Sequence, residues 1–168
     1  MRPNKGDHIP YFDYYINLVK EDNLIDALEK NKTEFLELLA SISSEKENHI
    51  YAPGKWTAMQ VINHIIDTER IFSYRALRFA RGDNQLLKSY DENSYADNAH
   101  LKNSNITLLR DEFNAVRISS ILLFKQLSEH ELRLVGNVES GKTTVLSIGF
   151  VICGHTLHHA SVIKERYL

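Results

Sequence analysis

Apolar residues return at helical spacing in four long stretches of the chain, separated by polar segments. In the first stretch, Leu24, Leu28, Phe35 and Leu39 share one face, and charged residues occupy much of the remainder. All prolines lie at or before Pro53, so the rest of the chain is free to be helical. The pattern predicts helices over about Leu24–Ile42, Ala58–Ala80, Ile106–Leu127 and Val145–Glu165. Four such helices favour an all-α four-helix bundle that forms one domain over residues 1–168.

Residues with side chains that cap helices stand before three of the predicted helices. A short polar side chain at this position accepts hydrogen bonds from the free N–H groups of the first turn. Thr57 is followed three residues later by Gln60, which is the spacing of a capping box. The candidate N-caps are Asp22 or Asn23, Thr57, and Ser104 or Asn105.

Three segments lack helical periodicity. Residues 1–21 contain Pro3, Gly6 and Pro10, which predict an irregular start to a segment that lies across the bundle surface and forms a short helical turn. Residues 84–104 form a long polar loop between the second and third helices, and loops this long are often functional. Residues 132–144 are rich in turn formers and predict a small hairpin.

The composition is that of an ordinary globular protein, with 43% hydrophobic and 25% charged residues. The 20 basic and 22 acidic residues leave no basic stripe, so nucleic acid is not an expected partner. The apolar stretch Val145–Cys153 is too short to cross a membrane. Cys153 is the only cysteine, which excludes an internal disulfide and points to a packing role. Without a secretion signal, the expected location is the cytoplasm.

Three of the eight histidines lie close together in the last predicted helix, in the sequence GHTLHHA. His155 and His159 are four residues apart and therefore lie on one helical face, where they interrupt an apolar stripe. Two neutral imidazoles at this spacing can chelate one metal ion. His158 projects about 60° away from His155, so it is a weaker candidate. The alternative is that both are core histidines bonded to water or carboxylates.

His64 lies in the second predicted helix, in the sequence INHIIDTER, at the edge of a buried face. Gln60, Asp67 and Arg75 project near the direction of His64 and form a polar lane along the helix. Such a lane indicates either a wet internal site or a solvated helix edge. Asp67 is a candidate acceptor for a ring N–H of His64. Together with His155 and His159, His64 would give a metal three nitrogen ligands and leave a position open for water or substrate. Such a site should lose its metal below about pH 6, because the reference pKa of histidine is about 6.5.

The chain resembles a known family in three motifs. These are GKWTAMQVINHIIDTERIFSYRALRFARGD, then YDENSY, and finally GHTLHHASVIKERYL. In order and separation they are similar to the DinB-like superfamily, whose members include bacillithiol transferases and mycothiol-dependent maleylpyruvate isomerases. The resemblance implies a four-helix bundle of up-down-down-up character and a metal, nickel or zinc, held by His64, His155 and His159. Many members form dimers, so a homodimer is expected.

The leading functional hypothesis is a metal-dependent transferase that activates a low-molecular-weight thiol for attack on an electrophile, in detoxification or stress response. A metal-dependent hydrolase is the alternative, with Asp67, Asp91 or Glu92 as the only visible general bases. A non-enzymatic metal-binding or interaction protein is the third. The expected partner is a small molecule. The residues expected near the metal or the pocket are Gln60, Asp67, Arg75, Asp91 and Tyr95.

Overall fold

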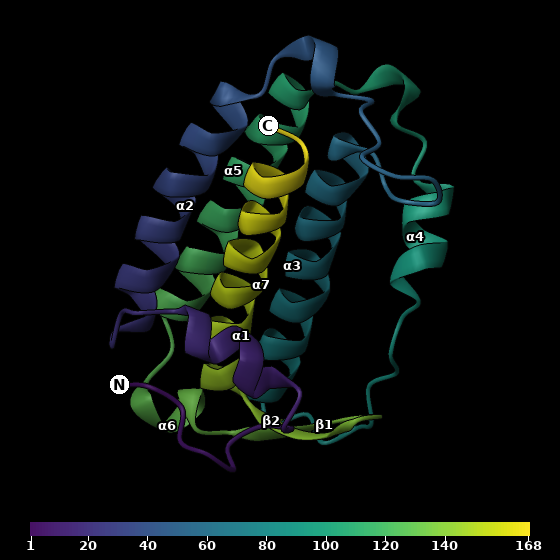
Figure 1. The fold of residues 1–168 in the computed structure, drawn as a ribbon. Coiled ribbons are helices and arrows are strands. Elements are labelled where there is room, and N and C mark those ends of the chain that lie inside the picture. Colours follow the sequence, from purple (N-terminus) through teal and green to yellow (C-terminus); the bar gives the residue numbers. More distant parts are fainter.

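The computed structural model describes all 168 residues and confirms the predicted four-helix bundle. The long helices stand side by side in Figure 1, and α7 is at the centre of that view. The bounds of α3 are those predicted, and the C-terminal ends of the other three differ by one or two residues, because the last turn of a helix is poorly specified by sequence. The bundle helices are α2 (Leu24–Ser41), α3 (Ala58–Ala80), α5 (Ile106–Lys125) and α7 (Val145–Arg166).

The bundle has an up-down-down-up order. Contacts between α3 and α5 advance in the same direction along both helices, from Glu69 with Arg117 to Ser73 with Ser120, so these two helices are parallel. A parallel pair needs a long return connection, and residues 81–105 provide it along the outside of the bundle (Figure 1). The long linker that the sequence shows between the second and third helices is therefore a requirement of the topology.

The predicted caps are confirmed, and each fixes the start of a bundle helix. Asn23 accepts hydrogen bonds from the first-turn N–H groups of α2, and Asn105 does the same for α5. Thr57 and Gln60 form the complete capping box of α3, with each side chain bonded to the other residue's backbone N–H. These caps satisfy donors that would otherwise be left without partners at the helix ends.

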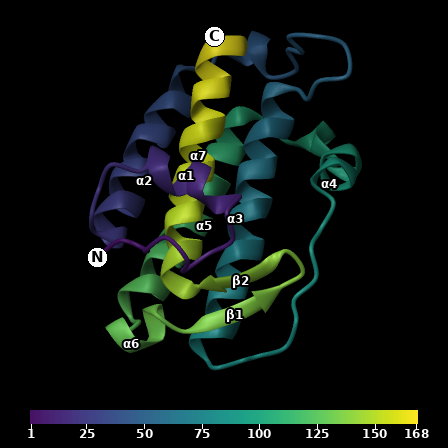
Figure 2. The same cartoon turned by 60° about the horizontal axis from the view of Figure 1, so that its bottom comes forward.

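The N-terminal segment is more regular than the sequence predicts. It contains a helix of seven residues, α1 (Phe12–Leu18), which lies across α7 in Figures 1 and 2. Close approach is possible because α7 has Gly154 at the crossing, where a Cβ atom would clash with the backbone carbonyl of Tyr15. Phe12 and Ile16 are buried by this contact. Tertiary packing therefore stabilises a helix that is too short to form alone.

The linker also contains a helix that the sequence analysis described as loop. This is α4 (Glu92–Asn98), which lies outside α3 (Figure 1). Asp91 caps it by accepting hydrogen bonds from two backbone N–H groups, and Ala96 is its buried residue. The remaining short helices are η1 (Ser44–Lys46), η2 (Leu101–Asn103) and α6 (Glu129–Leu132). The predicted hairpin is present as β1 (Val135–Val138) and β2 (Gly141–Thr144), and it closes one end of the bundle (Figure 2).

A buried polar layer divides the hydrophobic core into two clusters. Arg117 is its centre and is fully buried. It donates two hydrogen bonds to the carboxylate of Glu69, at 2.8 and 2.9 Å, and others to Asn31 and Thr156. The layer therefore has one residue from each bundle helix. We use the name polar layer for Asn31, Glu69, Arg117 and Thr156.

Helix α7 is long and apolar enough, by length and composition, to cross a membrane. In the structure 67% of its most apolar window is buried against the other helices. The core helix of a water-soluble bundle has the same properties, so the apolar character of α7 is explained by its central position in the fold.

The packing of α1 on α7 predicts that two equivalent substitutions in α7 change the free energy of unfolding by different amounts. Gly154→Ala should lower the free energy of unfolding by about 1–3 kcal/mol, because the new methyl group meets rigid backbone of α1. Gly149→Ala is the matched control, since its methyl group meets mainly the flexible side chain of Leu24. Both gain similar helix propensity. Denaturant unfolding, with limited proteolysis of the N-terminal segment, measures the difference. Equal effects for the two variants would contradict the assigned contact.

Candidate metal centre

Three histidine side chains from two bundle helices converge on one point. His64 lies in α3, and His155 and His159 lie one turn apart in α7. The Nε2 atom of His155 is 3.0 Å from Nε2 of His64 and 3.1 Å from Nε2 of His159. One ligand atom of each histidine lies within 4.8 Å of the other two. The i,i+4 pair that the sequence indicates is therefore joined by the histidine of the second bundle helix.

The arrangement of these nitrogens fits a divalent cation better than it fits hydrogen bonds. A neutral imidazole nitrogen has one in-plane site, which holds either a proton or a lone pair. Nε2 of His155 contacts two other Nε2 atoms, so it cannot make a good hydrogen bond to both. A metal ion held at about 2.0–2.1 Å by nitrogen separates its ligand atoms by roughly 3.0–3.4 Å, close to the distances found. The three residues could therefore hold one ion through three lone pairs.

The electrostatic environment keeps these histidines neutral. Burial lowers the pKa of His64 to about 4, although the carboxylate of Glu92 acts in the opposite direction. Burial lowers the pKa of His159 to about 3, and neighbouring histidines add to the effect. The pKa of His155, which is almost completely buried, is lowered well below its ordinary value for the same reasons. The neutral imidazole is the form that binds metal, so the site is prepared for a cation at physiological pH.

A cavity of about 300 Å³ opens over the histidine cluster. Its walls are mainly aromatic, and they come from α1, α3, α7, the turn before α3 and the linker around α4. Glu92 is the one carboxylate among the lining residues, and there is no lysine or arginine. The lining residues are Tyr11, Phe12, Tyr15, Trp56, His64, Thr68, Phe72, Tyr90, Glu92, Val151, His155, His158 and His159. A ligand in this cavity would contact the histidine cluster directly.

Helix α1 covers one side of the cluster. The ring of Tyr15 lies 5.7 Å from the ring of His155, and the hydroxyl group of Tyr14 is 2.9 Å from Nδ1 of His158. Burial raises the pKa of Tyr15, so its hydroxyl group stays protonated. His158 therefore engages α1 rather than the cluster, which agrees with its lower rank among the sequence candidates.

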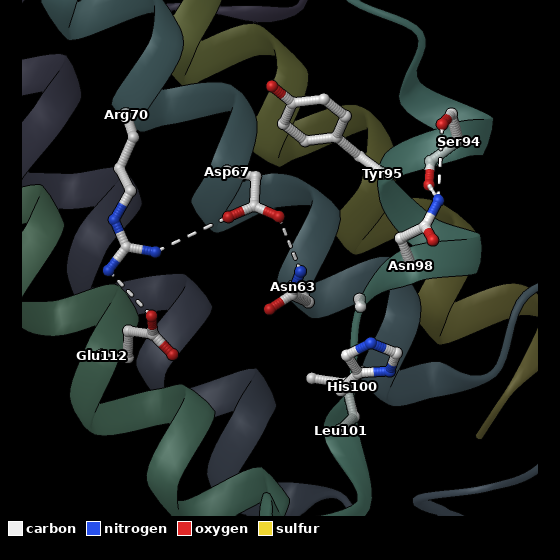
Figure 3. Close-up of a pocket in the computed structure, with 10 residues that line it drawn as sticks. Asn63, Asp67, Arg70, Ser94, Tyr95, Asn98, His100, Leu101 and Glu112 are labelled. Carbon is white, nitrogen blue, oxygen red and sulfur yellow. Dashed lines mark hydrogen bonds and ion pairs between the residues drawn. The ribbon is translucent and has the colours of Figure 1, made fainter.

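The structure does not bring Asp67 to His64. Asp67 accepts a hydrogen bond of 2.7 Å from Asn63 and pairs with Arg70 at 3.6 Å, and Arg70 also pairs with Glu112 (Figure 3). These side chains line a different recess of about 520 Å³, between α3, α4 and α5. The reason is the packing of α5 beside α3, because Glu112 of α5 pairs with Arg70, which in turn pairs with Asp67 on the side of α3 away from the cluster.

The other four residues expected at the pocket do not line the cavity, but they support residues that do. Arg75 lies over the ring of Phe72 and donates a hydrogen bond of 2.8 Å to the carbonyl of Lys88. Gln60 donates one of 3.1 Å to the carbonyl of Ala96 in α4. Asp91 caps α4, and the ring of Tyr95 packs 5.0 Å from that of Tyr90. Gln60 and Arg75 hold the linker against α3, whereas Asp91 and Tyr95 make contacts within the linker.

The aromatic residues of α1 and the tryptophan before α3 were missed as pocket residues. The sequence carried a partial signal, since Tyr11, Phe12, Tyr14 and Tyr15 are too dense for an ordinary surface segment. Their position over the histidines depends on the crossing at Gly154, which no periodicity shows. Cys153 is buried, as expected, and burial raises the pKa of its thiol to about 12. Cys153 is therefore an unreactive core residue.

Comparisons with known proteins agree with this fold. Residues 27–163 match the family model of the DinB superfamily. A search of curated proteins finds no match. Among solved structures, the chain is similar to YfiT from Bacillus subtilis, with a TM-score of 0.76 and 16% sequence identity, covering 98% of this chain and 90% of that one. YfiT is described as a probable metal-dependent hydrolase with an unusual four-helix bundle topology. The family match covers most of the chain, and the chain therefore belongs to the DinB superfamily.

Proposed function

We propose that this protein is a metal-dependent enzyme that transfers a low-molecular-weight thiol onto an electrophile, with nickel or zinc on His64, His155 and His159. The observation that carries the proposal is the convergence of three Nε2 atoms at an open cavity without a fourth protein ligand. Structural zinc sites normally have four protein ligands, whereas catalytic sites have three and leave a position for a reactant.

A divalent ion bound there would lower the pKa of a coordinated thiol and hold it as the thiolate, which is the nucleophile. The chain supplies the rest of the site. Its buried imidazoles stay neutral and keep their lone pairs available. The mostly aromatic walls provide ring surfaces for an apolar electrophile. These features orient two reactants at one point, which is a large part of catalysis.

Hydrolysis is a second candidate, and Glu92 is the observation that favours it. Glu92 is the only carboxylate that lines the cavity, and it makes no ion pair. A free carboxylate in this position could accept a proton from an attacking water molecule. Of the three acidic residues considered from sequence, Asp67 and Asp91 are engaged elsewhere. The description of YfiT as a probable metal-dependent hydrolase supports the same possibility.

Metal content should depend on each of the three histidines. The purified protein should hold about one divalent ion per chain, and alanine at His64, His155 or His159 should sharply reduce this content because two ligands bind weakly. His130→Ala is the control, since it removes an exposed imidazole in α6. Elemental analysis measures the result. Full occupancy in the His159 variant would show that His158 can take its place.

Metal binding should persist to lower pH than the sequence alone predicts. Because burial lowers the pKa of His64 to about 4 and of His159 to about 3, protons should displace the metal mainly below about pH 5. Metal content after equilibration at successive pH values tests this. Complete loss already at about pH 6 would contradict the assigned burial.

A control for unfolding is needed in that experiment. Unfolded histidines have a pKa of about 6.5, so below this pH the unfolded state binds more protons than the metal-free folded state. The free energy of unfolding should therefore fall as the pH decreases from about 6.5 toward about 4. Circular dichroism at each pH separates metal release from loss of the fold.

Metal-loaded protein should accelerate conjugation of a small thiol to an electrophile, and His155→Ala should abolish this rate while the protein stays folded, because the bundle has its own core. His130→Ala should behave as the unmodified protein. Consumption of thiol, measured over panels of thiols and electrophiles, is the assay. If loaded and metal-free protein behave alike in every combination, thiol transfer is excluded. Metal-dependent ester hydrolysis without thiol, lost in Glu92→Gln, would then support the second candidate.

A further inference from the structure

A second cavity also borders the histidine cluster. It has a volume of about 250 Å³ and lies between the turn before α3, the start of α4 and the end of α7. Trp56 and His159 line both cavities. His159 is itself one of the three candidate metal ligands, so a ligand in the second cavity would contact the cluster directly. The lining residues are Tyr51, Gly54, Lys55, Trp56, Val61, Asn93, His159, Val162 and Tyr167.

The wall between the two cavities is fixed in place. The buried hydroxyl group of Tyr167 donates a hydrogen bond of 2.7 Å to the carbonyl of Trp56. The indole ring of Trp56 lies 5.0 Å from the imidazole ring of His64. Gly54 has a φ of 73°, which allows the tight turn that presents Trp56 at this point. The hydrogen bond therefore fixes the backbone of Trp56, and the indole ring packs against His64 between the two cavities.

The two cavities differ in charge. The first contains the carboxylate of Glu92 and no lysine or arginine, and its walls are mostly aromatic. The second contains Lys55, the amide of Asn93 and no carboxylate. Lys55 is exposed, and no ion pair with a carboxylate occupies its ammonium group. At the edge of the second cavity, the guanidinium group of Arg166 lies 6.0 Å from the ring of Tyr51. The second cavity is thus the positively charged side of the centre.

We propose that the centre binds two substrates in separate cavities: an uncharged, apolar electrophile in the aromatic cavity, and a thiol whose carboxylate-bearing tail lies in the second cavity beside Lys55. The inference rests on the proposed transferase function and names its substrate classes. An anionic tail would be repelled by Glu92 in the first cavity and attracted by Lys55 in the second. Hydrolysis by water requires only one organic substrate, so it would leave the second cavity without a role.

Binding can be measured directly because Trp56 is the only tryptophan of the chain. Its fluorescence reports on ligands in either cavity. We would titrate the zinc-loaded protein with N-acetylcysteine, which has a carboxylate, and with N-acetylcysteinamide, which is neutral and of nearly equal size. The acid should bind about threefold more tightly at low ionic strength, as expected for one partly exposed charge pair, and the preference should vanish near 1 M salt.

Lys55→Gln should abolish the preference for the acid and leave the affinity for the amide unchanged. Lys142→Gln is the matched control, because Lys142 is an exposed lysine of β2 at the other end of the bundle. Equal affinities for acid and amide in the unmodified protein, binding of neither thiol, or an unchanged preference in Lys55→Gln would each overturn the assignment.

Conjugation of both thiols to chlorodinitrobenzene, measured in parallel, separates this inference from the proposed function. A charge preference in binding without metal-dependent conjugation would keep the cavity assignment and reject thiol transfer. Conjugation with equal KM for acid and amide would keep thiol transfer and reject the cavity assignment. We expect the acid to have both a lower KM and a lower Kd than the amide in the unmodified protein. Both differences should disappear in Lys55→Gln.

Discussion

The buried guanidinium of Arg117 is the constraint on which the arrangement of the helices depends. Its five N–H groups are all used, by both carboxylate oxygens of Glu69, by Asn31 and Thr156, and by the carbonyl of Leu28. An Arg–Glu pair of this kind adds little net stability, but loss of one partner leaves a buried charge and costs about 3–5 kcal/mol. The pair therefore acts mainly by excluding other registers, since only one alignment of the four helices satisfies every group.

The same constraint places the candidate metal ligands. Thr156 of the polar layer directly follows His155, and Glu69 lies five residues after His64 on α3. A slide of α7 by one residue relative to α3 would break the contact between Thr156 and Arg117 and separate the Nε2 atoms that now lie 3.0 Å apart. Three imidazoles must meet within a few tenths of an ångström to share an ion. A bundle held by apolar side chains alone would specify that register less sharply.

Sequence periodicity predicted the bundle helices, their caps and the pair of histidines in α7, because each depends on spacing within a single helix, whereas His64, which lies in another helix, was assigned to that pair with the help of the family resemblance. Thr57 with Gln60, and His155 with His159, are of this kind. It could not place Asp67, since the choice between facing His64 and facing Arg70 depends on how α5 packs beside α3. The sequence also contains an indication of the polar layer. Arg117 stands four residues after Phe113 and four before Ile121, and so interrupts an apolar stripe.

The elements that sequence described least well are those that form the cavity walls. Helices α1 and α4 are short and have little helical stability of their own, so they take their positions from α7 and α3. None of the four residues of the polar layer and none of the three histidines lies in these two helices. The bundle would then determine whether a metal binds, while α1, α4 and the turn at Trp56 determine which molecules reach it. Proteins that share the histidines can therefore differ in reaction, and substrate assignments should be drawn from these peripheral segments.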